Sequence, residues 1–122
     1  MVPKINRLTK KKDFETVSLR GVSVKNAFLI CKILRNNTPE NRFGFVVSKK
    51  VSTKATIRNK VKRRLRSIII LEKERIEKSF DIIIITLPGI EKKEFIDLRE
   101  MLIICFTVFA FYSKHTNSVM LN

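Results

Sequence analysis

A basic segment in the middle of the chain holds the residues that are best suited to chemistry. From Ser48 to Arg66 the sequence reads SKKVSTKATIRNKVKRRLR, with nine Lys or Arg residues and no Asp or Glu. Lysine and arginine form charge-assisted hydrogen bonds with phosphate groups, so the ligand that fits this segment is a polyanion such as nucleic acid. The alternative is an ordinary helix face that is covered by water.

Residues for acid–base, nucleophilic or metal chemistry are scarce. His115 is the single histidine and stands in the polar end of the chain, where we interpret it as a surface residue rather than a base. No Cys and His residues have zinc-site spacing, and the three glycines form no phosphate-binding loop. Asp13, Glu15 and Glu40 are scattered and suggest no two-metal site. The sequence predicts a binding protein that has neither catalytic residues nor metal ligands of its own.

The net charge of +15 is distributed unevenly along the 122 residues. Residues 1–66 carry 19 Lys or Arg against three acids, whereas residues 67–122 carry seven against eight. A bias of this size destabilises a compact fold by self-repulsion, so we expect an external polyanion to neutralise it. Nucleic acid is the first candidate and an anionic membrane surface is the second.

The membrane alternative is weaker because the apolar stripe beside the basic residues is narrow and is needed by the core. The longest uncharged apolar segment is 101–112. It is shorter than the roughly 20 residues that span a bilayer. Cys31 and Cys105 stand in apolar surroundings with no CxxC spacing, so we expect buried free thiols. These features predict a soluble, cytoplasmic protein with no membrane partner.

Periodicity and turn residues divide the chain into the elements that position the basic segment. We predict helices over 10–20, 56–78 and 94–112, strands over 27–34, 42–48 and 81–87, a short strand near Val24, and a frayed tail over 113–122. The turn at 36–39 predicts that the first two long strands pair as antiparallel neighbours. The strand at 81–87 is apolar on both faces, as a central or parallel strand would be. The order predicts a single domain over 1–122, an α+β two-layer sandwich with helices on a mostly antiparallel sheet.

The helix at 56–78 separates its apolar and basic residues onto different faces. Ile57, Val61, Leu65 and Ile68 recur at helical spacing and form a core stripe, and Thr56 is a candidate cap. A parallel ridge is formed by Arg58, Lys62 and Arg66, and it is widened by Lys60, Arg63 and Arg64. Like charges at i, i+4 cost roughly 0.2–0.5 kcal/mol per pair in an isolated helix. We therefore favour a bound polyanion over a solvated face.

The strand at 42–48 also has two distinct faces. Phe43, Phe45 and Val47 alternate onto one side, which we assign to the core. The opposite side is flat because Gly44 has no side chain. That side is either open to a ligand or simply tolerates a glycine, and the sequence does not decide between the two.

These residues resemble the protein subunit of bacterial ribonuclease P. The family signature is a strand that ends in Ser-Lys-Lys, followed by a loop and a helix that opens with Arg-Asn-Arg and a Lys-Arg pair. Here the matching residues are Ser48-Lys49-Lys50, Arg58-Asn59-Lys60 and Lys62-Arg63. The segments RLTKKKDFETV, RFGFVVSKK, DIIIITLPG and FIDLRE extend the resemblance over about residues 5–104. It implies a fold like domain 2 of ribosomal protein S5, with a left-handed β-α-β crossover.

The resemblance implies roles for particular residues. The catalytic RNA would be contacted by Arg58, Asn59, Lys60, Lys62 and Arg63, and we add Arg66 from the geometry of the ridge. Phosphates of the RNA or of a substrate leader would be met by Lys49 and Lys50. Phe14 matches an aromatic residue of the first helix, on which a base or sugar stacks.

This chain departs from the family pattern at several positions. Lys60 stands where the family has an arginine, and lysine keeps the charge but lacks the planar guanidinium group. Ser18 stands where a second aromatic often follows Phe14, and Lys32 matches a strand tyrosine, so charge replaces stacking. By alternation Phe28 shares the face of Lys32, and it is either a replacement ring or a core residue. The apolar stretch 101–112 is unlike the charged last helix of the family, and a buried helix and a weak self-association surface are both open.

The implied function is that of the protein subunit of ribonuclease P, an endoribonuclease. It binds the catalytic RNA and the 5′ leader of precursor tRNA and assists endonucleolytic removal of that leader. The resemblance places the chemistry in the RNA subunit with Mg²⁺, and we expect one protein per RNA. The alternative is a non-catalytic RNA-binding protein, such as a ribosomal protein or RNA chaperone of the same fold. DNA binding is weaker, because the basic helix has no obvious helix-turn-helix partner.

Overall fold

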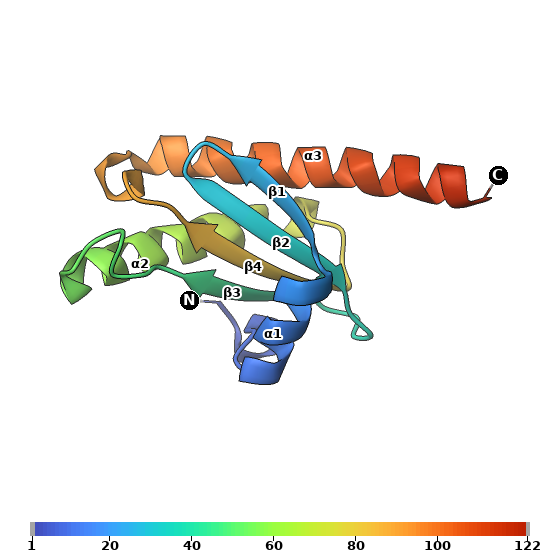
Figure 1. Ribbon diagram of the computed structural model, residues 1–122, viewed down its shortest axis with the longest axis horizontal. Coiled ribbons are helices and arrows are strands. Elements are labelled where there is room, and N and C mark those ends of the chain that lie inside the picture. Colours follow the sequence, from blue (N-terminus) through green and yellow to red (C-terminus); the bar gives the residue numbers. More distant parts are fainter. Residues whose placement is uncertain (1, 122) are drawn as a thin grey trace.

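The computed structural model describes residues 2–121, with side chains as far as Lys114. The core is built from one sheet and three helices (Figure 1). In chain order the elements are η1 (Lys4–Asn6), α1 (Lys11–Arg20), β1 (Val22–Asn26), β2 (Leu29–Arg35), β3 (Arg42–Val46), α2 (Ala55–Glu72), η2 (Lys73–Arg75), β4 (Phe80–Thr86), η3 (Ile90–Lys92) and α3 (Phe95–Leu121), where η marks a 3-10 helix.

The four-stranded sheet is mixed and has the order β1-β2-β4-β3. The β1–β2 and β2–β4 pairs are antiparallel, and β3–β4 is parallel, with Gly44 opposite Ile83. The prediction that the strands at 27–34 and 42–48 are paired neighbours is therefore wrong. Strand β4 lies between them, because a strand that is apolar on both faces is stable only where both faces are covered. The predicted central position of β4 and the short strand near Val24 are confirmed.

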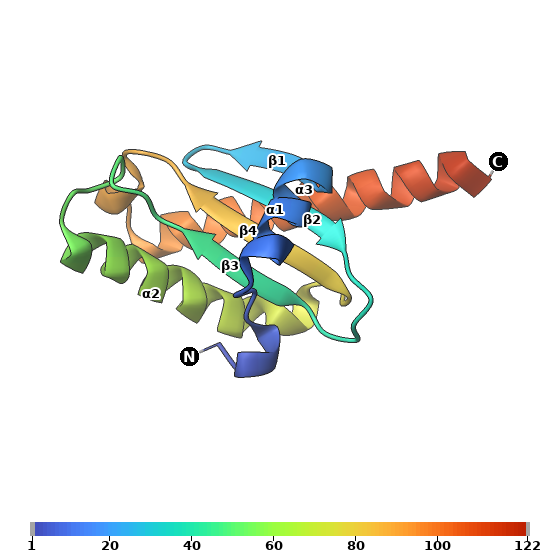
Figure 2. The same ribbon diagram turned by 60° about the horizontal axis from the view of Figure 1, so that its bottom comes forward.

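Helices α2 and α3 cover one face of the sheet, and α1 covers part of the other (Figure 2). The main core contains Phe43 and Val47 of β3, with Val61, Leu65 and Ile68 of α2, as predicted. A smaller cluster joins Leu8, Val17 and Ile83 on the α1 side, so α1 adds a partial third layer to the expected sandwich. The crossover from β3 through α2 to β4 is left-handed in Figure 1, as the resemblance implied. The α+β architecture is confirmed.

The ends of the helices differ from the predicted ends. Helix α2 begins at Ala55, and neither Thr56 nor the N-cap residue Lys54 makes a side-chain cap hydrogen bond. It ends at Glu72, whose buried carboxylate binds Arg99 at 2.7 Å, and the mixed-charge residues that follow form η2. Helix α3 continues to Leu121, so the tail expected to fray from residue 113 is helical (Figure 1). The side chain of His115 and the whole of Asn122 lie outside the described residues.

The two cysteines are free and buried, as predicted. Cys31 of β2 and Cys105 of α3 belong to the same core cluster. A hydrogen bond to Cys105 and burial raise the pKa of the Cys31 thiol well above its ordinary value, so this thiol stays neutral. Among the described residues, no helix is long and apolar enough to cross a membrane.

Candidate nucleic-acid interface

The basic ridge of α2 lies on the flank of the helix that borders β3. Arg58, Lys62 and Arg66 follow one another at i, i+4 and i+8, beside the buried stripe of Val61 and Leu65. The guanidinium of Arg66 stands 5.7 Å from the ring centroid of Phe45 in β3, which places the ridge against the edge of the sheet. Asn59, Lys60 and Arg63 are exposed on the neighbouring outer face. The expected RNA-binding residues of α2 thus form one continuous surface.

Two of the arginines in this helix also donate hydrogen bonds to main-chain carbonyl oxygens. Nη1 of Arg58 donates hydrogen bonds to the carbonyl oxygens of Ser52 at 3.0 Å and Thr53 at 2.9 Å. Arg64 lies on the other flank and donates to the carbonyl of Lys93 at 3.2 Å. Arg58 therefore fixes the loop before α2, and Arg64 faces the start of α3 rather than the ridge.

The first turn of α2 adds positive potential to the ridge. It contains no acidic residue, and the N-terminus of a helix carries a partial positive charge from its free N–H groups. Lys49 and Lys50 are exposed in the turn that links β3 to this helix, at the same end of the molecule. Charge of one sign gathered on both sides of a helix N-terminus favours a bound anion.

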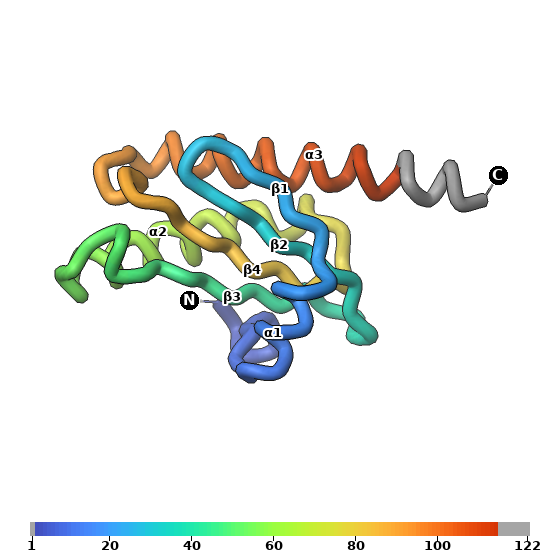
Figure 3. Tube along the Cα trace, in the orientation of Figure 1, coloured from blue at the N-terminus to red at the C-terminus, as the bar shows by residue number. Residues whose placement is uncertain are grey.

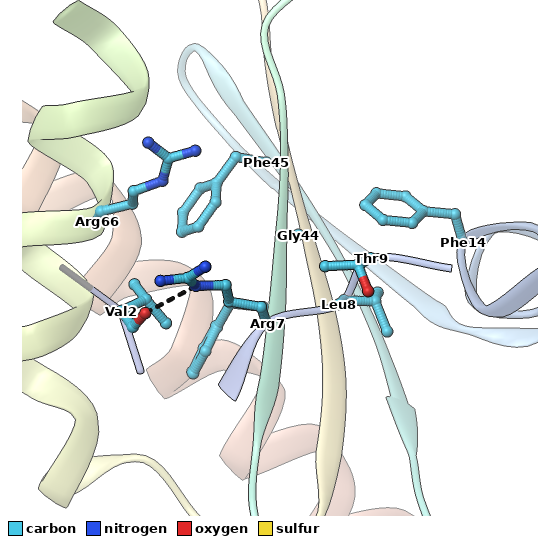
Figure 4. A pocket seen from close by; sticks show the side chains of 9 residues that line it. Val2, Arg7, Leu8, Thr9, Phe14, Gly44, Phe45 and Arg66 are labelled. Carbon is cyan, nitrogen blue, oxygen red and sulfur yellow. Dashed lines mark hydrogen bonds between the residues drawn. The ribbon is translucent and has the colours of Figure 1, made fainter. Parts of the chain in front are cut away.

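A cavity of about 310 Å³ adjoins the ridge at the edge of β3 (Figure 4). Arg66 contributes from α2, Phe14 from α1, and Gly44 and Phe45 from β3, while the remaining lining residues are Val2, Arg7, Leu8, Thr9 and Phe43. No acidic residue is among them. The cavity joins the predicted RNA-binding helix to the predicted stacking residue Phe14.

Gly44 brings Phe14 close to the sheet. A Cβ added at Gly44 would stand 2.4 Å from Cζ of Phe14, so any other residue would displace the ring. The flat face of β3 is therefore covered by an aromatic ring at this point, and that ring lines the cavity. Neither sequence interpretation describes Gly44 fully, because the flat face is not open at this point but covered by Phe14, and the glycine is required for that close approach.

Some residues of the cavity were absent from the sequence-based prediction. Arg7 forms a parallel β-bridge with Phe43, and the N–H of Leu8 donates to the carbonyl of Phe43 at 2.9 Å. The chain before α1 thereby runs along part of the free edge of β3 (Figure 3). Arg7 could not be assigned because a single bridge between distant segments leaves no periodic signal. Phe45 was assigned to the core, and it is packed against the core but also lines the cavity.

Two predicted leader-binding residues lie away from the cavity. Lys32 is on the α1 side of the sheet, but its Nζ donates to the carbonyl of Ser18 at 3.3 Å, at the C-terminal end of α1. Phe28 is not in a strand, because Ala27 has a φ of 51° and turns the chain between β1 and β2. Its ring packs on the main core under Gly89 and Lys93, so Phe28 is no replacement ring for the cavity.

The carboxylates near the N-terminal end of β3 are engaged by Arg42. Its Nη2 binds Asp81 at 2.6 Å and its Nη1 binds Asp13 at 3.4 Å. The hydrogen bonds that Arg42 donates to Asp81 raise the pKa of Arg42 further above its ordinary value. Among the described residues, no group of three His, Cys, Asp or Glu side chains could hold a metal ion. Near the cavity, the described carboxylates Asp13 and Asp81 are both paired with Arg42, which does not fit a resident Mg²⁺ at that place.

Comparison with known proteins identifies the family. The family model described as ribonuclease P matches residues 2–109. The ribonuclease P protein component of Synechocystis is 40% identical over 88 residues, which is 71% of each chain. That of Alkaliphilus metalliredigens is 36% identical over 98 residues, which is 80% of this chain and 87% of the relative.

Solved structures agree with this assignment. The RNase P protein of Staphylococcus aureus superposes with a TM-score of 0.78 at 28% identity, covering 84% of this chain and 94% of that one. The RNase P protein of Thermotoga maritima gives a TM-score of 0.76 at 33% identity, covering 82% and 94%. The chain belongs to the ribonuclease P protein family.

Proposed function

We propose that this protein docks its α2 ridge on ribonuclease P RNA and holds the 5′ leader of precursor tRNA in the cavity beside β3. Membership of the family makes the chain part of an endoribonuclease complex whose partner is ribonuclease P RNA. The observation that carries the finer proposal is the acid-free cavity, which joins Arg66 of the ridge to the ring of Phe14. One strand of RNA can meet phosphate-binding and stacking groups in the same place.

Each part of the surface has a distinct task in this proposal. Lys62, Arg63 and Arg66 neutralise phosphates of the RNA, which gives strong dependence on salt. Lys49 and Lys50 meet phosphates at the start of α2. Phe14 offers a ring on which a leader base stacks, with no requirement for a particular base. Binding of the leader in turn assists the endonucleolytic cut that produces the mature 5′ end of the tRNA.

The chemical step is assigned to the RNA subunit. The carboxylates of Asp13, Asp81 and Glu72 are paired with arginines, and among the described residues no cluster of three acidic or metal-binding side chains supports a catalytic role for the protein. Magnesium, when present, is bound mainly by the RNA and stabilises the charge that develops at the phosphate. We propose one protein per RNA in the cytoplasm, where tRNA precursors are processed.

The alternative, a general RNA-binding protein, makes a different prediction about the leader. A general binder holds any structured RNA with similar affinity, since phosphates carry no sequence or processing information. The proposed function requires that the complex with ribonuclease P RNA bind precursor tRNA more tightly than the same tRNA without its leader. Equal binding of the two, measured by fluorescence titration, excludes leader recognition and favours the general binder.

Phe14→Leu is expected to remove most of the additional affinity that the leader gives to precursor tRNA. Stacking of one base on an aromatic ring contributes roughly 1–3 kcal/mol, which corresponds to about fivefold to more than a hundredfold in affinity. Leucine keeps apolar contact with the sheet but offers no ring face. Binding of leaderless tRNA should not change. The matched control is Phe106→Leu, a half-buried ring of α3 on the opposite face of the sheet. Equal losses in both variants would exclude Phe14 from leader binding.

A further inference from the structure

Two arginines from distant parts of the sequence line the same side of the cavity. Arg7 belongs to the segment before α1, and Arg66 belongs to the fourth turn of α2. In Figure 4 both side chains lie on the opposite side of β3 from Phe14, and both line the same cavity. In the described part of the chain, neither arginine pairs with a carboxylate within 4.0 Å. No described acidic side chain therefore neutralises the positive charges of Arg7 and Arg66.

Arg7 is held in place by its backbone and by its own side chain. The β-bridge to Phe43 fixes its main chain along the edge of β3. Its Nε donates to the carbonyl oxygen of the buried residue Val2 at 2.9 Å. This bond occupies one side of the guanidinium and leaves the two terminal nitrogens available. A guanidinium fixed in this way loses little rotational freedom when it binds a ligand.

Arg66 is held by a different contact. Its guanidinium lies 5.7 Å from the centroid of the Phe45 ring, within the range of a cation–π interaction. Phe45 is itself packed against the main core, so the ring is a rigid support. Two positive groups that are directed into one cavity repel each other unless an anion lies between them. The geometry thus calls for a small anion at the edge of β3.

We infer that Arg7 and Arg66 together clamp one RNA phosphate at the edge of β3, with Arg7 as a binding residue that the proposed function did not include. The inference rests on that proposed function, since RNA supplies the phosphate. Planar guanidinium groups bind phosphate oxygens through paired, charge-assisted hydrogen bonds. The phosphate belongs either to the 5′ leader or to ribonuclease P RNA, and both present the same phosphodiester.

The test replaces Arg7 by glutamine and measures two affinities. The first is that of the protein for ribonuclease P RNA, and the second is that of the assembled complex for precursor tRNA. Arg7→Gln should lower one of the two by about tenfold and flatten its salt dependence by about one unit in the slope of log K against log salt. The affinity that falls identifies the RNA that supplies the phosphate. Arg20→Gln, which removes the same charge from an exposed site outside the cavity, should leave both affinities within about twofold.

A double-mutant cycle tests whether one phosphate is shared. If Arg7 and Arg66 hold the same phosphate, the combined variant loses less or more affinity than the product of the two single losses. Losses that simply multiply would overturn the shared clamp, as would an Arg7→Gln variant that matches Arg20→Gln in both assays. Failure of the proposed function is recognised separately, because the unmodified protein would then bind precursor and leaderless tRNA equally. Circular dichroism and thermal unfolding confirm that each variant is folded.

Discussion

Replacing Lys62, Arg63 and Arg66 together by glutamine is expected to weaken binding of ribonuclease P RNA by about a hundredfold at roughly 0.1 M salt. Each phosphate contact releases slightly less than one counterion, so each contributes somewhat less than a factor of ten under these conditions. The three side chains lie on or beside the ridge and have no carboxylate partner among residues 2–114. Arg58 is left unchanged because it also holds the loop carbonyls of Ser52 and Thr53.

The measurement is a filter-binding titration at several salt concentrations. The slope of log K against log salt should become smaller by about two to three units in the triple variant. The charge-matched control replaces Arg20, Lys25 and Lys92, which are exposed and lie outside α2. If the control lowers affinity and slope as much as the ridge variant, net charge rather than the ridge of α2 binds the RNA, and the docking surface is wrong.

Arg42→Met is expected to lower the free energy of unfolding by about 3 kcal/mol, because it leaves a buried carboxylate without its cation. Arg42 holds Asp81 through two hydrogen bonds, of 2.8 Å from Nε and 2.6 Å from Nη2. The side chain of Asp81 is only 8% exposed, whereas that of Arg42 is 26% exposed, so we take the lower end of the range for buried pairs. After the substitution, Asn36 remains as the single described donor to this carboxylate, at 2.8 Å.

Thermal and urea unfolding measure this effect. A loss of this size should lower the melting temperature by roughly 10–20 °C in a domain of this length. Arg20→Met is the matched control, since an exposed arginine without described contacts should change stability by less than about 0.5 kcal/mol. A variant of Arg42 as stable as this control would show that the ion pair with Asp81 contributes nothing net to the fold.

The elements could be predicted from the sequence where periodicity decides them. The double-faced apolar pattern of β4 indicated a central strand, and the Ile57-to-Ile68 stripe indicated which side of α2 is buried. Strand pairing was harder. The short loop between β2 and β3 favoured a hairpin, but β4 needs a partner on each edge and displaces it. Loop length therefore predicted the wrong strand pairing, because burying β4 between β2 and β3 is favoured over a direct β2–β3 hairpin.

The candidate site could be predicted only in part, for similar reasons. The ridge of α2 follows from helical spacing alone, and Phe14 came from the family motif. Arg7 reaches the cavity through one β-bridge to Phe43, which no local pattern signals. Phe28 was misplaced because alternation holds only inside a strand, and the positive φ of Ala27 ends β1 before it. The sequence indicated a flat face at Gly44. It did not indicate that Phe14, which belongs to α1, packs against this face.

The most direct test of the account is a cleavage assay at low magnesium. A bacterial ribonuclease P RNA is mixed with a precursor tRNA, with and without this protein, and release of the 5′ leader is followed over time. We expect the leader to be released at a magnesium concentration at which the RNA alone is inactive, and the variant with Lys62, Arg63 and Arg66 replaced to lose this stimulation. Tight binding of the RNA with no stimulation of cleavage would contradict the account and leave the basic ridge as a general phosphate-binding surface.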